Sequence, residues 1–237
     1  MNTRILFLLG LFLTAVAPSF AQVQFVPNGA HRFSAGIGGG VARLYGDLPN
    51  RSMTPVGRIN VEYKLKEFLS FGLEGQIGTL ETGVKNAVPD AAGRYLRSSS
   101  WGLHSVNSFQ AVNAYGRVGI GMLTEDNEDL SRLIKNIYAG IGFGIIRNSM
   151  SDIVARFPEN NAKISNVKDK SIGIALPISA GINVDIPGTN ITGNFNVQYN
   201  ITNSEGLDGY DFTSGGLKKD GYLFISLGVK YNFGPLL

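Results

Sequence analysis

Two-residue alternation of apolar and polar side chains constrains this chain more than any other feature of its sequence. From Phe33 onward, apolar residues recur at every second position through most of the chain. The clearest run covers residues 58–65, where Ile, Val, Tyr and Leu alternate with Arg, Asn, Glu and Lys. Because successive side chains of a β-strand point to opposite faces, this period predicts strands with one apolar and one polar face.

Eight such segments are present, and the connections between them alternate in length. The segments cover residues 33–41, 58–65, 69–77, 112–122, 137–145, 171–185, 191–201 and 222–233. Short turns are expected at 66–68 and 187–190, and long loops at 81–106, 147–170 and 203–220. An even strand count with short turns at one end and long loops at the other is typical of a transmembrane β-barrel. The sequence therefore predicts an all-β fold, an eight-stranded antiparallel transmembrane up-and-down β-barrel with both termini in the periplasm.

A soluble barrel or sandwich of the lipocalin type is the alternative fold. It would show the same alternation, but its apolar face would point inward around a ligand. Two features favour the membrane barrel. The polar face is rich in Asn, Gln, Gly and opposite charges, and aromatic residues collect toward strand ends, where a membrane barrel has its interfacial girdles. These aromatic residues are Phe33, Tyr63, Phe71, Tyr199, Tyr231 and Phe233.

The first 21 residues have the pattern of a secretory signal peptide. Arg4 precedes an apolar run over residues 5–16, and Ser19-Phe20-Ala21 forms a small-x-small cleavage site. The apolar run is shorter than the ~20 residues that a membrane-spanning helix needs. We therefore expect two regions, a signal peptide at 1–21 and the outer-membrane barrel at 22–237.

Composition excludes several kinds of chemistry. The chain has no Cys and two His, so it has no disulfides and no thiolate metal site, and we expect no cofactor and no metal. Without Arg4, 20 basic residues stand against 18 acidic ones. A net charge this small gives no reason to expect binding to nucleic acid.

With these segments in place, the chain resembles the eight-stranded outer-membrane barrels typified by the OmpA transmembrane domain and OmpX. Its closing GVKYNF, residues 228–233, resembles the C-terminal strand signal of such proteins, although Gly-Pro-Leu-Leu follows the last aromatic residue. The resemblance implies a place in the cell outer membrane of a Gram-negative bacterium. It also implies contact with outer-membrane lipid and lipopolysaccharide, and with the barrel assembly machinery during biogenesis.

A second, shorter resemblance concerns residues 36–50, GIGGGVARLYGDLPN. Small barrels with Tyr-Gly-Asp-Leu after the first strand include members of type IX secretion and gliding machinery. This resemblance implies an alternative function, as a barrel subunit of a secretion or motility complex with an envelope protein partner.

The polar faces of the predicted strands carry two residues of each charge, Arg58, Glu62, Glu74 and Arg117. An eight-stranded barrel has an interior just wide enough for side chains to fill. We therefore predict that these four residues form a neutralising network in the lumen and that the barrel has no pore. A gated proton or ion path is the alternative use of charges inside a membrane.

An enzymatic alternative depends on His104 and Ser105. Some small outer-membrane barrels act on lipid A with His, Ser and an acidic residue near the outer rim, and Glu81 or Asp90 would be the acid here. Side chains of adjacent residues in an extended segment do not point together. We therefore expect a protein that is not an enzyme, with a lipid A-modifying enzyme as the alternative.

The long loops carry the remaining functional signal. Aromatic and Arg residues are frequent contact anchors, and loops on a rigid scaffold commonly bind partners. The candidate contact residues are Tyr95, Arg97, Trp101, Phe157, Tyr210 and Phe212. The sequence thus favours an envelope-structural or surface-binding protein, while the same aromatic residues would also suit simple packing of the loops on the rim.

Overall fold

Eight antiparallel strands form a closed barrel in which each strand pairs with its neighbours in the sequence and β8 pairs with β1. They are β1 (His31–Tyr45), β2 (Met53–Lys66), β3 (Leu69–Gly83), β4 (Leu103–Gly119), β5 (Ile137–Ala155), β6 (Lys170–Asp185), β7 (Ile191–Thr202) and β8 (Gly221–Leu236). This computed structural model describes residues 31–46, 52–66, 68–83, 103–120, 136–155, 170–203, 207 and 220–236. The predicted fold class is confirmed, and the predicted signal peptide at 1–21 lies outside the described residues.

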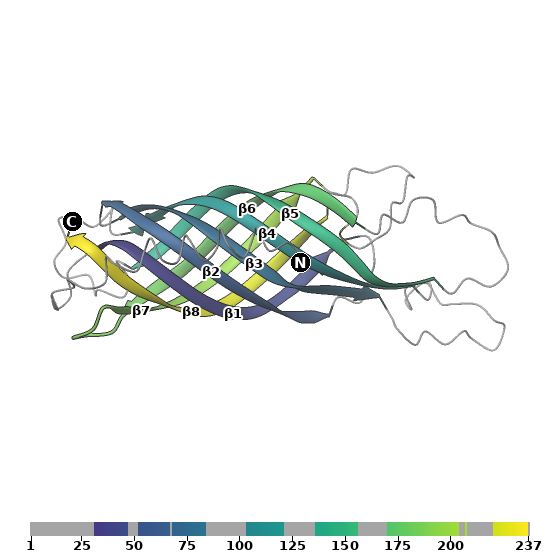
Figure 1. Ribbon diagram of the computed structural model, residues 1–237, viewed down its shortest axis with the longest axis horizontal. Coiled ribbons are helices and arrows are strands. Elements are labelled where there is room, and N and C mark those ends of the chain that lie inside the picture. The colour runs from purple at the N-terminus through teal and green to yellow at the C-terminus, as the bar shows by residue number, and fades with distance from the viewer. Residues whose placement is uncertain are drawn as a thin grey trace, which may run out of the picture.

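The register of the strands gives the barrel a strong tilt. Hydrogen-bonded partners followed once around the barrel from Phe33 lead back to β1 at Arg43, ten residues further along. Ten residues of ~3.3 Å against eight strand spacings of ~4.8 Å correspond to a tilt of about 40°. Figure 1 shows the strands inclined in this way around the long axis. Membrane barrels have strand tilts in this range.

Both predicted short turns are present, and they lie at one end of the barrel. One joins Lys66 to Leu69. In the other, the carbonyl oxygen of Ile186 accepts hydrogen bonds from the backbone N (3.2 Å) and the Oγ1 (2.9 Å) of Thr189. Gly188 adopts a φ of 74°, which glycine does without strain. These turns, the start of β1 and the end of β8 define the turn end, at the left in Figure 1, and the opposite end is the loop end.

The barrel is apolar outside and polar inside. Outward residues such as Ile37, Ile141 and Leu227 are 65–67% exposed, whereas Glu74 and Asn196 in the lumen are at most 1% exposed. This polarity is the reverse of that of a soluble barrel, so the soluble alternative is wrong, and the eight strands form a transmembrane barrel. No helix in the described part of the chain is long and apolar enough to cross a membrane.

Aromatic side chains border the apolar outer surface at both ends. At the turn end, the Phe33 ring lies 5.0 Å from Tyr63 and 6.0 Å from Phe233, measured between ring centroids. Toward the loop end, Tyr45 and Tyr199 meet edge to face at 6.0 Å. Twelve residues of β1 separate Phe33 from Tyr45, which at this tilt is about 30 Å along the barrel axis. This spacing matches an apolar band of ~25 Å with interfacial girdles.

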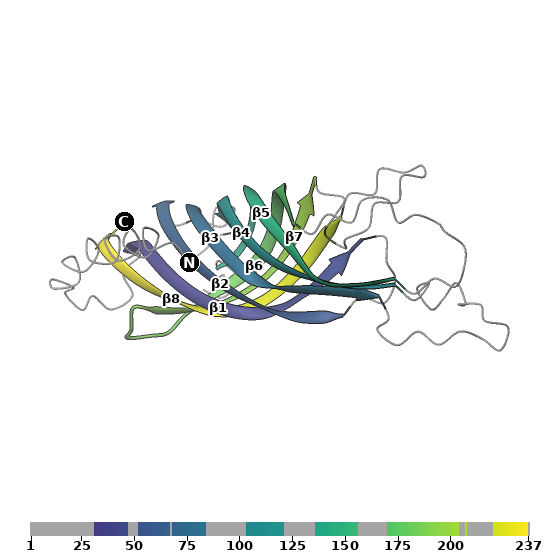
Figure 2. The ribbon, with the colours of Figure 1, turned by 45° about the vertical axis from the view of Figure 1, so that its right-hand side comes forward.

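Several strands continue further toward the loop end than the sequence pattern predicted. β3 continues to Gly83, β4 begins at Leu103 and β5 continues to Ala155. The predicted loop limits at 81–106 and 147–170 are therefore wrong at these ends. In Figure 2 the long strands β3–β5 extend to the right, at the loop end.

The reason lies in the outward side chains of these extensions. Thr79, Ser108 and Arg147 face outward there, at about the axial height of Tyr45. Above the apolar band the outer face of a strand meets headgroups and water, so its outward residues no longer need to be apolar. The alternation in the sequence therefore stops before the strands do.

Candidate functional site: the polar lumen

The lumen contains the four charged residues predicted from the alternation, and the structure places all four inside the barrel. Arg58 and Glu62 come from β2, Glu74 from β3 and Arg117 from β4, and each is at most 4% exposed. They point inward because each shares the parity of the polar face of its strand. Asn60 lies directly opposite Glu74, so Arg58 and Glu62 are the diagonal neighbours of Glu74.

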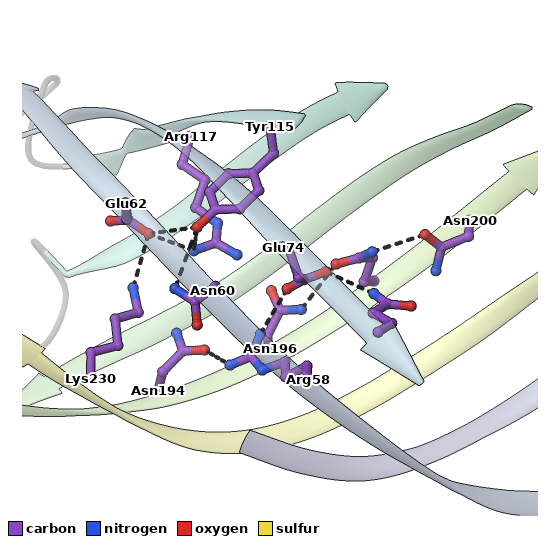
Figure 3. A network of polar contacts seen from close by, with 12 residues as sticks. Arg58, Asn60, Glu62, Glu74, Tyr115, Arg117, Asn194, Asn196, Asn200 and Lys230 are labelled. Carbon is purple, nitrogen blue, oxygen red and sulfur yellow. Dashed lines mark hydrogen bonds and ion pairs between the residues drawn. The ribbon is translucent and has the colours of Figure 1, made fainter. Parts of the chain in front are cut away.

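Glu62 is the centre of one cluster. Its Oε2 atom lies 2.7 Å from Nη1 of Arg117 and 3.1 Å from Nζ of Lys230 on β8. The hydroxyl of Tyr115 donates a third hydrogen bond to the same oxygen at 3.2 Å. The Arg117 guanidinium also lies over two aromatic rings, with its Cζ 4.0 Å from the centroid of Tyr115 and 4.7 Å from that of Tyr138. Figure 3 shows Tyr115, Arg117 and Lys230 converging on Glu62 from different strands.

Glu74 is the centre of a second cluster, nearer the middle of the barrel. Its Oε2 accepts a hydrogen bond from Nη1 of Arg58 at 3.4 Å, and its Oε1 accepts one from Nε2 of Gln76 at 2.7 Å. Nη2 of Arg58 also donates to Oδ1 of Asn194 on β7. Gln76 in turn accepts a hydrogen bond of 2.8 Å from the hydroxyl of Tyr222. The second cluster thus has one cation and one carboxylate.

Amide side chains of β7 continue the network along the barrel. Asn194 donates to the hydroxyl of Tyr138 at 3.0 Å, and Tyr138 donates to Oδ1 of Asn196 at 2.9 Å. Asn196 donates to Gln198 at 3.5 Å, and Gln198 donates to Asn200 at 2.8 Å. The lumen face of β7 therefore provides a polar column beside the two charged clusters.

Sequence reasoning missed Lys230 as a member of the network. The alternation places it on the inward face of the last strand, and that signal was sufficient to find it. The four residues of the predicted network already had a net charge of zero, so charge balance did not call for a fifth member. Its contact with Glu62 spans 168 positions of the sequence, so only the closed barrel reveals it.

An apolar layer fills the lumen at the loop end. It consists of Ala42, Leu44, Val56, Leu80, Phe109, Ala111, Ile146, Ala175, Leu207, Tyr222 and Phe224. Leu207 comes from the connection between β7 and β8, and its backbone is held on both sides. Its carbonyl accepts a hydrogen bond of 3.0 Å from Asn107, and its N–H donates one of 2.9 Å to Asp220.

The candidate catalytic residues lie on the extension of the barrel wall. Nε2 of His104 is 2.9 Å from Oε1 of Glu81, so the structure brings these two together. Ser105 lies opposite Thr82, whereas His104 lies opposite Gly83, so the two adjacent side chains belong to opposite faces of the wall. Asp90 lies outside the described residues.

The predicted loop contacts are not part of the described chain. Tyr95, Arg97, Trp101, Phe157, Tyr210 and Phe212 all lie outside it. Within the described residues, no group of three or more His, Cys, Asp or Glu side chains could hold a metal ion.

No family model and no curated protein matches this chain. Solved structures resemble it at low identity. Neisserial surface protein A of Neisseria is 12% identical, with 87% of this chain and 100% of that chain covered and a TM-score of 0.47. Ail of Yersinia pestis is 14% identical, with 86% and 99% covered and a TM-score of 0.44. OprG of Pseudomonas aeruginosa is 12% identical, with 86% and 99% covered and a TM-score of 0.39.

Proposed function

We propose that this chain is a non-enzymatic outer-membrane barrel that acts as an envelope-structural or surface-binding protein. The observation that carries the proposal is the filled lumen. Charged and amide side chains occupy the part nearer the turn end, and the apolar layer with Leu207 occupies the loop end. Apolar side chains across a narrow passage exclude hydrated ions, so this barrel is better suited to a rigid support than to transport.

The proposed function then depends on the connections that the barrel presents at its loop end. Long connections join the strands at the loop end, which we place at the cell surface, with the turn end in the periplasm. Rigid scaffolds commonly present binding residues on such loops. The candidate contacts remain Tyr95, Arg97, Trp101, Phe157, Tyr210 and Phe212, with lipopolysaccharide, outer-membrane lipid or an envelope protein as the surrounding partners.

Two experiments test the proposal. The refolded protein in planar bilayers is expected to give no single-channel steps, with a sixteen-stranded porin as the conducting control, and large, regular steps would contradict the non-conducting role. The tagged protein, crosslinked in cells and gently extracted from outer membranes, is expected to be recovered without a stoichiometric secretion or motility subunit. Recovery with such a subunit would replace this proposal by the machine-component alternative.

The pairing of His104 with Glu81 favours one second candidate, a lipid A-modifying enzyme. A His oriented by a carboxylate is one part of a nucleophilic site. The neighbouring Ser105 faces the other side of the wall, so it does not complete that site. We expect cells carrying His104→Ala to have the same lipid A acyl pattern by mass spectrometry as cells carrying the wild type, and an altered pattern would support the enzyme.

A further inference from the structure

A small pocket opens into the lumen at the turn end, and it reaches the Glu62 cluster. Its volume is about 60 Å³. The residues around it include Ser34, Glu62, Arg117 and Lys230 from inside the barrel, with Lys64 and Asp185 nearer the rim. A buried water molecule needs roughly 10–15 Å³ of cavity, so the pocket has room for a few waters or one small ion. It is too small for a nucleotide or a sugar.

The charges at the pocket do not balance. Glu62 alone faces two cations, Arg117 and Lys230, because Glu74 is paired with Arg58. The lumen-facing residues of these two clusters therefore carry three cations and two carboxylates. Lys64 and Asp185 at the rim have opposite signs and are more exposed, so they add no net charge. An uncompensated buried charge is unfavourable, and a counter-ion beside it would relieve that cost.

Buried donors at the pocket have no acceptor. Ser34 is 1% exposed, and its hydroxyl makes no hydrogen bond within the described part of the chain. It lies directly opposite Glu62 on one side and Asn232 on the other. Nε of Arg117 likewise has no hydrogen-bond partner there. A buried donor without a partner in a cationic pocket calls for a negatively charged acceptor.

We propose that the turn-end pocket binds one small anion, a carboxylate or an inorganic ion of similar size, through Lys230, Arg117 and Ser34. This inference goes beyond the proposed function, because it concerns the lumen and not the loops. The anion neutralises the third cation and accepts the hydrogen bond of Ser34. A bound anion would make the stability of the barrel depend on the anion in solution, because a ligand that binds only the folded state stabilises it.

The test compares sodium formate with sodium gluconate at equal ionic strength, using the full mature chain in detergent micelles. Formate fits the pocket, whereas gluconate is too large. The unfolding temperature is expected to rise with the logarithm of the formate concentration above the dissociation constant, by about 5 °C at a hundredfold excess. Equal unfolding temperatures in the two salts at every concentration would overturn the proposal.

Matched variants separate the pocket from general salt effects. Lys230→Met is expected to lose the formate dependence, and Lys64→Met, which removes the same charge at the rim, is expected to keep it. Loss of the dependence in both variants would show charge screening only and would overturn the proposal. If Lys230→Met does not fold, Ser34→Ala serves in its place, with formate affinity expected to fall about tenfold.

A second measurement locates the anion. Crystals grown or soaked in sodium bromide are expected to show an anomalous peak between Lys230, Arg117 and Ser34. Bromide peaks confined to the outer surface would mean an adventitious ion only, and would overturn the proposal. Neither result depends on channel activity or on a loop partner, so failure here leaves the proposed function untouched.

Discussion

Lys230 on β8 reaches across β1 to pair with Glu62 on β2, at 3.1 Å between Nζ and Oε2. Gly36 of β1 lies between them in the register, opposite Lys230 on one side and Asn60 on the other. A Cβ atom at Gly36 would come within 3.0 Å of Cγ of Lys230 and 2.7 Å of Oδ1 of Asn60. The absence of a side chain at this position leaves space for the ion pair, which forms only when the last strand closes on the first.

The unequal charges of the Glu62 cluster predict unequal effects of two substitutions. Glu62→Gln leaves Arg117 and Lys230 buried without their carboxylate, and removal of one partner from a buried pair costs about 3–5 kcal/mol. Lys230→Met leaves Glu62 paired with Arg117, so its free energy of unfolding should stay within about 1 kcal/mol of the wild type. Urea unfolding of the barrel refolded in lipid vesicles measures both values. A larger loss for Lys230→Met than for Glu62→Gln would contradict this account of the cluster.

A second prediction concerns the Glu74 cluster. Glu74→Ala leaves Arg58 without its carboxylate and should lower the free energy of unfolding by about 3 kcal/mol. The double variant Arg58→Met/Glu74→Met removes both charges and should recover most of that loss, because no isolated charge remains. Neither variant touches the apolar layer at the loop end, so both should stay silent in planar bilayers. A large conductance step in either one would show that the charged cluster, and not the apolar layer, closes the barrel.

The sequence was sufficient for the fold because a strand has only two faces. Once Arg58, Asn60 and Glu62 alternate with apolar residues, one face must point to lipid and the other to the lumen. The short turn predicted at 66–68 then keeps Glu74 on the same face, and the register places Glu74 opposite Asn60. The positions of Arg58, Glu62, Glu74 and Arg117 inside the barrel follow from parity alone.

Contacts between distant strands do not follow from parity. The register around the closed barrel decides that Arg117 and Lys230 both reach Glu62, and no local pattern contains that register. The apolar layer at the loop end was not predicted from the sequence for a related reason. Phe109 and Tyr222 turn inward among polar neighbours, and their rings meet in the lumen with centroids 5.1 Å apart. Local alternation cannot predict that the loop end is filled in this way.

Glycine positions in the lumen make a third prediction. A Cβ at Gly72 would lie 2.5 Å from the ring and the hydroxyl of Tyr115, which is held by Glu62 and Arg117. Gly72→Ala should therefore destabilise the barrel by about 1–3 kcal/mol, as overpacking does. Gly57→Ala on the outer face is the control, because its Cβ would meet nothing closer than 3.8 Å, from Ile77. Because the Cβ at Gly72 would also lie 2.6 Å from the carbonyl oxygen of Val61, equal free energies of unfolding for the two variants would show that both Tyr115 and the backbone of β2 move aside freely.

The placement of the apolar band predicts that the loss of stability caused by a charged side chain on the outer face depends on the depth of that side chain in the membrane. Ile59 and Met53 on β2 are similarly exposed, at 63% and 60%, and both face outward. Ile59 is four residues from the girdle residue Tyr63, about 10 Å along the axis at this tilt, whereas Met53 is ten residues away, or about 25 Å. A band of ~25 Å puts Ile59 near the middle of the membrane and Met53 at its edge.

Ile59→Lys should therefore lower the free energy of unfolding by about 2–4 kcal/mol, and Met53→Lys by no more than about 1 kcal/mol. Reversible urea unfolding in vesicles with a hydrocarbon thickness near 25 Å gives both values. Equal losses would mean that the band is not centred near Ile59, and a larger loss for Met53→Lys would shift the band toward the loop end. In short-chain detergent micelles, which have no fixed midplane, the difference between the two variants should shrink. The difference in free energy of unfolding between these two variants thus measures where the barrel sits in the membrane, and it depends on neither the lumen nor the loops.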